Sequence, residues 1–255
     1  MIRPMPTSKA TNNSGYSLIE LIVVVIIIGI IAGVAVRSLR GANDVGKVEL
    51  TKQRLDKIAN AISGDPNLVS GGNRTSYGYV GDVGSLPPNL DALVTNPGGY
   101  STWRGPYVVD ELTPDGTNTR FKQDGWGQAL TYSAGTTVSS SGGGTAIVRT
   151  IAPSSAALLL NHVGVAVTDL RHAVPGTIYR DSVKFLLDVP NGTGGTTTKI
   201  KYPASDGFAE YDSIPIGERQ LRVVYIPNND TVRRLVHIDP GTTAHVQVQL
   251  FRKVW

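Results

Sequence analysis

The fold is decided by residues 15–36, which read GYSLIE at 15–20 and LIVVVIIIGIIAGVAV at 21–36. No residue of 21–36 is charged or strongly polar, and Glu20 is the only charge after Gly15 in this stretch. A helix over residues 16–36 is roughly 30 Å long, about the thickness of the hydrocarbon core of a bilayer. Residues 16–36 are therefore a candidate membrane-spanning helix.

A polar leader, residues 1–15, precedes the apolar run. An ordinary secretory signal has a short apolar run before its cleavage site, whereas here the apolar run follows Gly15. We therefore expect the apolar helix to be retained in the mature chain. The leader carries Arg3 and Lys9. Because positive charge favours the cytoplasmic side, residues 37–255 are expected to be extracytoplasmic.

Glu20 is unusual because a carboxylate in an apolar membrane helix costs at least a few kcal/mol unless it has a partner. If the chain is cut after Gly15, the new α-amino group of Tyr16 lies one helical turn from Glu20. It can then neutralise the equivalent glutamate of a neighbouring subunit. At about 4 Å and an effective dielectric of about 20, this attraction is on the order of 4 kcal/mol before desolvation. The pair would set the axial register of a polymer.

The leader ending in Gly15, the GYSLIE segment and the apolar run together resemble the class III signal and helix of type IV pilins and type II secretion pseudopilins. The resemblance implies that a prepilin peptidase cuts between Gly15 and Tyr16 and N-methylates Tyr16. It also implies that Tyr16 and Glu20 serve subunit assembly. A plain single-pass anchor, with its glutamate near the membrane interface, is the alternative.

The sequence departs from this family pattern at two positions. Tyr16 replaces the usual phenylalanine after the cut, and Arg37 replaces the proline that often follows the membrane stretch. Local unwinding of the helix therefore depends on glycine, which weakens a helix by roughly 0.5–1 kcal/mol relative to alanine. The glycines available for this helix flexibility are Gly29 and Gly33, with Gly41 and Gly46 beyond them.

The resemblance also implies partners and a location. The expected partners are copies of the same chain or other pilins in a mixed filament, the prepilin peptidase and an inner-membrane assembly platform. The precursor is expected in the bacterial inner membrane, as a single-pass protein with a cytoplasmic N-terminus. After assembly it would belong to a periplasmic or extracellular filament.

Beyond residue 36, apolar residues recur at a helical period among charged residues. Gly64, followed by Asp65 and Pro66, is a stop signal. We therefore expect one helix over residues 16–63, apolar all round in its first half and amphipathic in its second. The amphipathic half carries Leu39, Ala42, Val45, Val48, Leu55, Ile58, Ala59 and Ile62.

Residues 64–138 are rich in turn residues and predict a small β-rich globular head. Two stretches, WRGPYV at 103–108 and DGWGQALTY at 124–132, resemble the head of the major pseudopilins. That resemblance implies that the second stretch forms a turn packed on the amphipathic helix. Gly125 stands where the family usually has proline.

Major pseudopilins typically bind calcium in a loop after this turn. Here the following stretch, residues 133–144, contains no carboxylate, and a calcium site without carboxylates would be weak. We therefore predict no calcium site and no cofactor. Asp110, Glu111 and Asp115 favour a solvated acidic loop over another cation site.

The segment SSSGGG at 139–144 predicts a flexible linker. Residues 145–255 then contain seven or eight short apolar runs separated by turn signals, which is typical of a β-sandwich. Residues 206–223 resemble the carboxypeptidase-regulatory, or prealbumin-like, sandwich, whose members are usually binding or spacer modules. The expected fold class is α+β: a long N-terminal helix packed on a β-rich head, followed by an all-β sandwich.

Nothing in the sequence predicts catalysis. Nucleophile elbows, phosphate loops and dinucleotide fingerprints are absent, and the chain has no cysteine. The chain has 24 basic and 20 acidic residues with no basic block, so no nucleic-acid partner is predicted. No catalytic residue is predicted. No metal site is predicted either, because the histidines lack close ligand spacing. These are His162, His172, His237 and His245.

Three functional readings follow. The leading one is a structural subunit of a type IV pilus-like filament, in particular a type II secretion pseudopilin. The second is a minor pilin or adhesin whose sandwich binds a surface, a carbohydrate or an exported protein. The third and least favoured is a membrane-anchored periplasmic enzyme.

Overall fold

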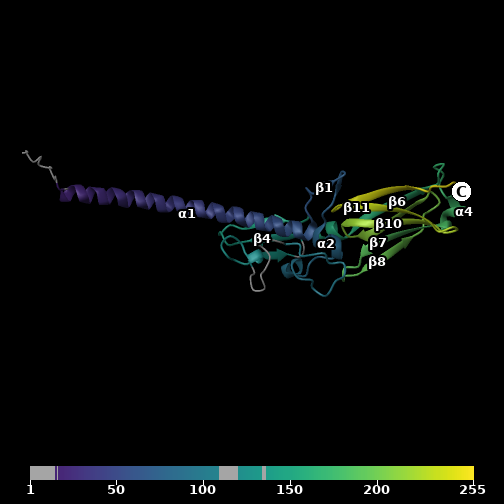
Figure 1. Cartoon of the computed structure of the whole chain (residues 1–255), viewed down its shortest axis with the longest axis horizontal. Coiled ribbons are helices and arrows are strands. Elements are labelled where there is room, and N and C mark those ends of the chain that lie inside the picture. The colour runs from purple at the N-terminus through teal and green to yellow at the C-terminus, as the bar shows by residue number, and fades with distance from the viewer. Residues whose placement is uncertain (1–14, 16, 109–119, 134–135) are drawn as a thin grey trace, which may run out of the picture. The chain divides into compact units, whose positions relative to one another are not determined.

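The computed structural model describes residues 15, 17–108, 120–133 and 136–255, with the side chains of 36–42 left undescribed. The chain divides into two units, Met1–Gly46 and Lys47–Trp255, which we treat separately. Figure 1 shows one long helix, α1, and several sheets. The expected α+β fold class, with a sandwich-like C-terminal part, is confirmed.

Helix α1 runs from Leu18 to Ser63, close to the bounds expected from its apolar period. In the first unit its apolar side chains are exposed over Leu18–Val34, with Ile28 at 59 %. The segment Leu18–Ala35 is long and apolar enough to cross a membrane, by length and composition. Such a surface needs lipid or other apolar helices around it, because exposed apolar area of this extent is unfavourable in water.

In the second unit, one face of α1 is buried in a hydrophobic core. Leu55, Ile58 and Ile62 are at most 1 % exposed and pack with Tyr79 and Phe121. The helix ends where Gly64 takes a left-handed conformation with φ of 83°. A Cβ atom at Gly64 would lie 2.0 Å from the carbonyl oxygen of Ser76, so only glycine fits there.

Short elements surround this part of α1 and make the head. A three-stranded antiparallel sheet, in the order β3-β4-β5, is its largest β element. The helical elements are α2 (Gly78–Val83), η1 (Leu90–Leu93), η3 (Arg120–Lys122) and α3 (Ser155–Leu159). The strands are β1 (Val69–Ser70), β2 (Asn73–Arg74), β3 (Thr131–Ser133), β4 (Thr137–Ser140) and β5 (Ile147–Thr150).

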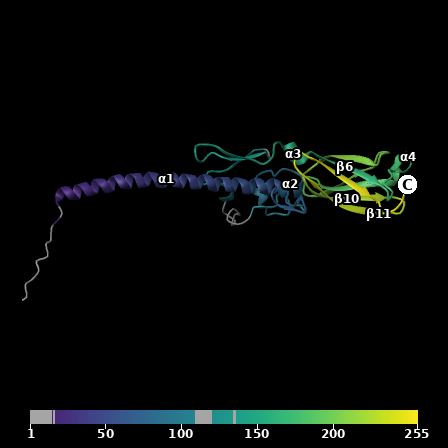
Figure 2. The same cartoon turned by 90° about the horizontal axis from the view of Figure 1, so that it is seen from above.

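The C-terminal part is a sandwich of two sheets, whose strands lie side by side in Figure 2. One sheet has the antiparallel order β11-β10-β7-β8, and the other has the order β12-β6-β9 with β12 parallel to β6. The strands are β6 (Asn161–Thr168), β7 (Val183–Pro190), β8 (Thr196–Lys201), β9 (Phe208–Ile214), β10 (Gly217–Tyr225), β11 (Asp230–Ile238) and β12 (Thr243–Gln249). Two short helices, α4 (Gly176–Tyr179) and η4 (Arg180–Ser182), connect β6 to β7.

Alternation of apolar and polar residues produces the core between these sheets. In β7 the side chains of Val183, Phe185 and Leu187 are fully buried, and the residues between them are partly exposed. They pack with Leu221 and Val223 of β10 in a core separate from that of the head. Period-2 patterning thus places one face of each strand inside the sandwich.

The structure differs from the expected linker at residues 139–144. Ser139 and Ser140 pair with Val148 and Ile147, so the segment is the end of β4 and the turn of a hairpin. Residues 145–160 also belong to the head and not to the sandwich, since Leu158 is buried in the head core. Local Ser/Gly composition suggested flexibility, but pairing with β5 and buried hydrogen bonds order the segment.

Direct main-chain contacts join the head to the sandwich. The amide of Ile216 donates to the carbonyl of Leu158 (2.9 Å), and the amide of Gly192 donates to the carbonyl of Val83 (3.0 Å). Ile216 itself is buried in the head core, directly before β10. The sandwich is therefore packed onto the head without an intervening linker.

Arg219 of β10 is the buried cation of this junction, at 6 % exposure. Its Nη1 donates to the carbonyl of Gly81 in α2 (2.8 Å), and its Nη2 donates to the carbonyls of Pro215 (3.2 Å) and Ile216. Burial lowers the pKa of Arg219 to about 10, so the guanidinium stays protonated at neutral pH. Its charge is stabilised by carbonyl dipoles of both the head and the sandwich.

We expect Arg219→Met to lower the free energy of unfolding by roughly 2–3 kcal/mol, because buried carbonyls on both sides of the junction lose a charged donor. Chemical denaturation of the full chain in detergent measures this loss. The matched control is Arg233→Met on the exposed face of β11, which should change stability by less than about 0.5 kcal/mol. Equal effects of the two substitutions would contradict a role for Arg219 at the junction.

Candidate functional site

The predicted assembly residues lie at the start of α1. Glu20 is in the first turn of the helix, exposed among exposed apolar side chains. Gly15 is also exposed, whereas Tyr16 lies outside the described residues. A carboxylate on an otherwise apolar helical surface is suited to bind one cationic partner group in an apolar environment.

Gly29 and Gly33, the positions predicted to allow unwinding, lie inside the continuous helix α1. A Cβ atom at either position would meet no atom within 4 Å in the single chain. Both glycines therefore leave shallow gaps on the helix surface. Their role in helix flexibility stays a prediction.

A second feature is the buried carboxylate of Asp124, which is 2 % exposed. Its Oδ1 accepts hydrogen bonds from the amides of Trp126 (2.8 Å) and Gln128 (2.9 Å). Its Oδ2 accepts the hydroxyl of Ser140 (2.6 Å) and the amide of Gly142 (3.2 Å). One carboxylate thus fixes both its own turn and the β4–β5 turn sixteen residues further on.

This turn also docks on the amphipathic part of α1, as its resemblance to the pseudopilin head implied. Arg54 donates to the carbonyl of Asp124 (3.0 Å), and the amide of Gly125 donates to the hydroxyl of Thr51 (2.9 Å). A Cβ atom at Gly125 would lie 2.4 Å from the carbonyl oxygen of Lys47. Proline at 125 would lose the amide and clash with the helix, which explains the departure from the family pattern.

Burial opposes ionisation of Asp124, but the hydrogen bonds from Ser140 and from the amides of Gln128, Trp126 and Gly142 outweigh it. They hold the pKa of the Asp124 carboxyl below its ordinary value. Asp124 is therefore ionised at neutral pH and accepts four donors.

The stretch considered from the sequence as a calcium loop, residues 133–144, takes part in the hydrogen bonds of Asp124. Residues 133–144 carry no carboxylate, and Ser140 and Gly142 of this stretch donate to Asp124. These donors occupy the carboxylate oxygens that a cation would need. Asp110, Glu111 and Asp115, the other acidic group considered from the sequence, lie outside the described residues.

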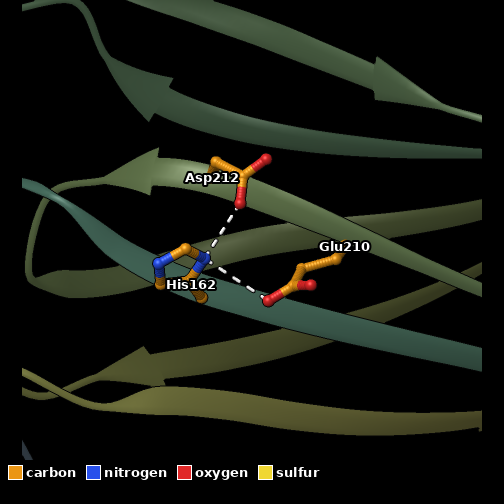
Figure 3. Close-up of side chains that lie close together, drawn as sticks. All are labelled: His162, Glu210 and Asp212. Carbon is orange, nitrogen blue, oxygen red and sulfur yellow. Dashed lines mark hydrogen bonds and ion pairs between the residues drawn. The ribbon is translucent and has the colours of Figure 1, made fainter.

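The sandwich brings together three side chains that the sequence analysis did not connect, although it named the histidine among them. Nδ1 of His162 lies 2.9 Å from Oδ1 of Asp212 and 3.3 Å from Oε1 of Glu210 (Figure 3). All three are exposed on the outer face of the sheet β12-β6-β9. Alternation in Glu210-Tyr211-Asp212 was a visible signal for two carboxylates on one strand face, but the pairing of β6 with β9 is set by topology and not by local sequence.

Comparison with known proteins identifies the family of the chain. Residues 10–36 match the family model described as the prokaryotic N-terminal methylation motif. The type II secretion system core protein G of Xanthomonas campestris pv. campestris is 34 % identical over 119 residues, which are 46 % of this chain and 73 % of that protein. The chain belongs to the family of this core protein, the pseudopilins of type II secretion systems.

Solved structures resemble the chain only weakly. The Bacillus anthracis TIE protein matches with a TM-score of 0.29 and 15 % identity, over 36 % of this chain and 16 % of that protein. The dioxygenase domain of a dioxygenase carbohydrate-binding protein fusion from Streptomyces sp. SirexAA-E matches with a TM-score of 0.28 and 10 % identity, over 37 % of this chain and 81 % of that domain. Neither likeness bears on function.

We expect Asp124→Asn to lower the free energy of unfolding at pH 7 by about 1.5–3 kcal/mol, because the amide has one acceptor oxygen where the carboxylate has two. The ionised Asp124 contributes its full share of the folding stability above the unfolded-state pKa of about 3.9. This share is lost as the pH falls from that value through the lower pKa of the folded state. The difference between variant and wild type should therefore shrink from pH 7 to pH 3. Denaturant unfolding at both pH values measures it.

The control for this titration is Asp181→Asn, which changes an exposed carboxylate on η4. It should leave stability within about 0.5 kcal/mol of wild type at both pH values. A difference for Asp124→Asn that stays constant from pH 7 to pH 3 would show that its ionisation is not what orders the two turns.

Proposed function

We propose that this pseudopilin is a structural subunit of the type II secretion pseudopilus that polymerises through α1 after cleavage behind Gly15. The observation that carries the proposal is the exposed apolar surface of Leu18–Ala35 interrupted by the carboxylate of Glu20. A single chain cannot cover that surface. A membrane covers it before assembly, and a bundle of neighbouring helices covers it in a filament.

The chemistry of assembly follows from Glu20. Cleavage after Gly15 creates an α-amino group on Tyr16, four residues before Glu20 in the sequence. When a subunit joins the filament, its Glu20 or its amino group pairs with the opposite group of a neighbour. Because an unpaired charge is costly among apolar helices, only an axial register that makes this pair is favourable. N-methylation of Tyr16 would keep the positive charge.

The same proposal sets location and partners. The precursor is held in the inner membrane by 16–36 with Arg3 and Lys9 on the cytoplasmic side, where positive charge is favoured. The prepilin peptidase removes residues 1–15, and an assembly platform adds the mature chain to a filament of like or related subunits. The role is structural, and no reaction is assigned to any residue.

A binding role for the sandwich, as in a minor pilin or adhesin, is the second candidate. A polar pocket of about 470 Å³ between head and sandwich favours it. Asp82, Arg104 and Glu218 line it, and the buried Nε of Arg219 has no hydrogen-bond partner within the described part of the chain. The two roles can be distinguished experimentally, because binding of a ligand to the sandwich would not depend on Glu20.

The first test is the mature N-terminus. Mass spectrometry of the chain from a strain with an active prepilin peptidase should show a chain beginning at N-methylated Tyr16. Gly15→Leu should leave the chain at its full length, because the peptidase requires the small residue before the cut. A wild-type chain that still begins at Met1 in purified filaments would overturn the proposal at its first step.

The second test separates processing from assembly. We expect Glu20→Gln to be cleaved normally and to remain in the membrane, but to be lost from sheared filaments by about tenfold or more, since loss of a pair worth over 1.4 kcal/mol changes an equilibrium by that factor. The matched control is Asp44→Asn, an exposed carboxylate later in α1, which should assemble as wild type. Equal assembly of the two variants would remove Glu20 from the mechanism.

A further inference from the structure

A β-bulge brings the three side chains of Figure 3 together. Asn161 of β6 pairs with Ile214 of β9, whereas Val163 pairs with Tyr211, so the register shifts between them. Asp212 and Ser213 therefore both lie opposite the β6 residue between those pairs, which is His162. The shift sets Asp212 beside His162 on the outer face, and alternation adds Glu210 on the same face.

The donor atoms are close enough to share one ion. Nδ1 of His162 and one carboxylate oxygen each from Glu210 and Asp212 all lie within 4.8 Å of one another. The side chains are 46 %, 46 % and 64 % exposed, so solvent reaches the group directly. A four-coordinate ion lies about 2.0–2.2 Å from each donor atom. Small side-chain rotations would bring these three donor atoms to the separations that such an ion needs.

We propose that His162, Glu210 and Asp212 form a binding site for a borderline divalent metal ion such as Zn²⁺. An imidazole nitrogen together with two carboxylate oxygens suits zinc and its neighbours, whereas Ca²⁺ and Mg²⁺ prefer oxygen ligands throughout. Two adjacent carboxylates also repel each other, and a divalent ion between them removes that repulsion. This proposal does not depend on filament assembly.

A second histidine lies on the neighbouring strand. His245 of β12 is the register partner of Gly164, and Glu210 of β9 is the partner of Gly164 on its other side. A Cβ atom at Gly164 would lie 2.8 Å from Nδ1 of His245, so the imidazole leans over β6 where glycine leaves room. His245 lies beside the group but is not among the three donors that lie within 4.8 Å of one another, so water completes the coordination of the ion.

The neighbouring cation does not occupy the site. Nζ of Lys199 donates to the main-chain carbonyls of Asp212 (2.9 Å) and Ser213 (3.1 Å), not to a carboxylate. The Asp212 carboxylate is therefore left to His162 and to an incoming ion. Lys199 holds the bulged backbone in place and so positions Asp212.

A bound ion would cross-link β6 and β9 at the point where their register shifts. It would bind the folded sandwich in preference to the unfolded chain, since the ligands come from strands 48 residues or more apart in sequence. Binding therefore raises the apparent stability of the chain with ion concentration.

Isothermal titration calorimetry of the untagged full chain in detergent, after treatment with a chelator, tests the site with ZnCl₂ as the probe. We expect one ion per chain and a higher unfolding temperature with zinc. His162→Gln and Asp212→Asn should each weaken binding by roughly tenfold or more, and His245→Gln should weaken it less. The matched control is His172→Gln, which changes an exposed histidine away from the group and should leave binding unchanged.

The unfolding temperature of each variant without zinc shows whether that variant is folded. Because the substituted side chains are exposed, these temperatures should equal that of the wild-type chain. Absence of saturable zinc binding by the wild-type chain would overturn the proposal. So would binding that is the same in His162→Gln and Asp212→Asn as in wild type. Tighter binding of CaCl₂ than of ZnCl₂, unaffected by His162→Gln, would also overturn it, because the imidazole would then not be a ligand.

Discussion

The buried face of α1 in the second unit is the constraint on which the folded part depends. Leu55, Ile58 and Ile62 are its apolar anchors, and the head core forms around them. Thr51 and Arg54 lie on the same part of the helix and hold the turn that carries Asp124. One helical face therefore sets both the apolar packing and the polar contacts of the head.

Polar contacts then extend this order to segments that have little apolar surface of their own. The turn after Asp124 is short and rich in glycine, and so is the turn after Ser140. Apolar burial alone would order neither of them. The Asp124 carboxylate supplies four acceptor positions at the place where both turns present donors, and a buried charge with this many donors is stable in its ionised form.

The sequence predicted those features of the fold that depend on a local pattern of residues. The bounds of α1 followed from an apolar run, a helical period and Gly64, all of which act over a few residues. The short apolar runs expected within residues 145–255 correspond to strands such as β7 (Val183–Pro190), because alternation is also a local property. The family resemblance came from the same local signals around Gly15 and Glu20.

Sequence failed where partners are distant along the chain. Residues 139–144 have the composition of a linker, yet their order comes from Asp124 and from β5. His162 has no ligand within a few positions in sequence, yet a register shift places it beside Asp212, fifty residues away. The strand order of a sheet fixes such contacts, and neither periodicity nor spacing reveals that order.

The junction changes how the sandwich should be regarded. Ile216 lies in the head core, and Leu221 and Val223, a few residues later in β10, lie in the sandwich core. Between them, Arg219 donates to carbonyls on both sides. A force on β10 would therefore act on both cores at once, since the strand is covalently continuous through them. The sandwich is therefore an extension of the pseudopilin head, packed directly onto it, and not a module separated from it by a linker.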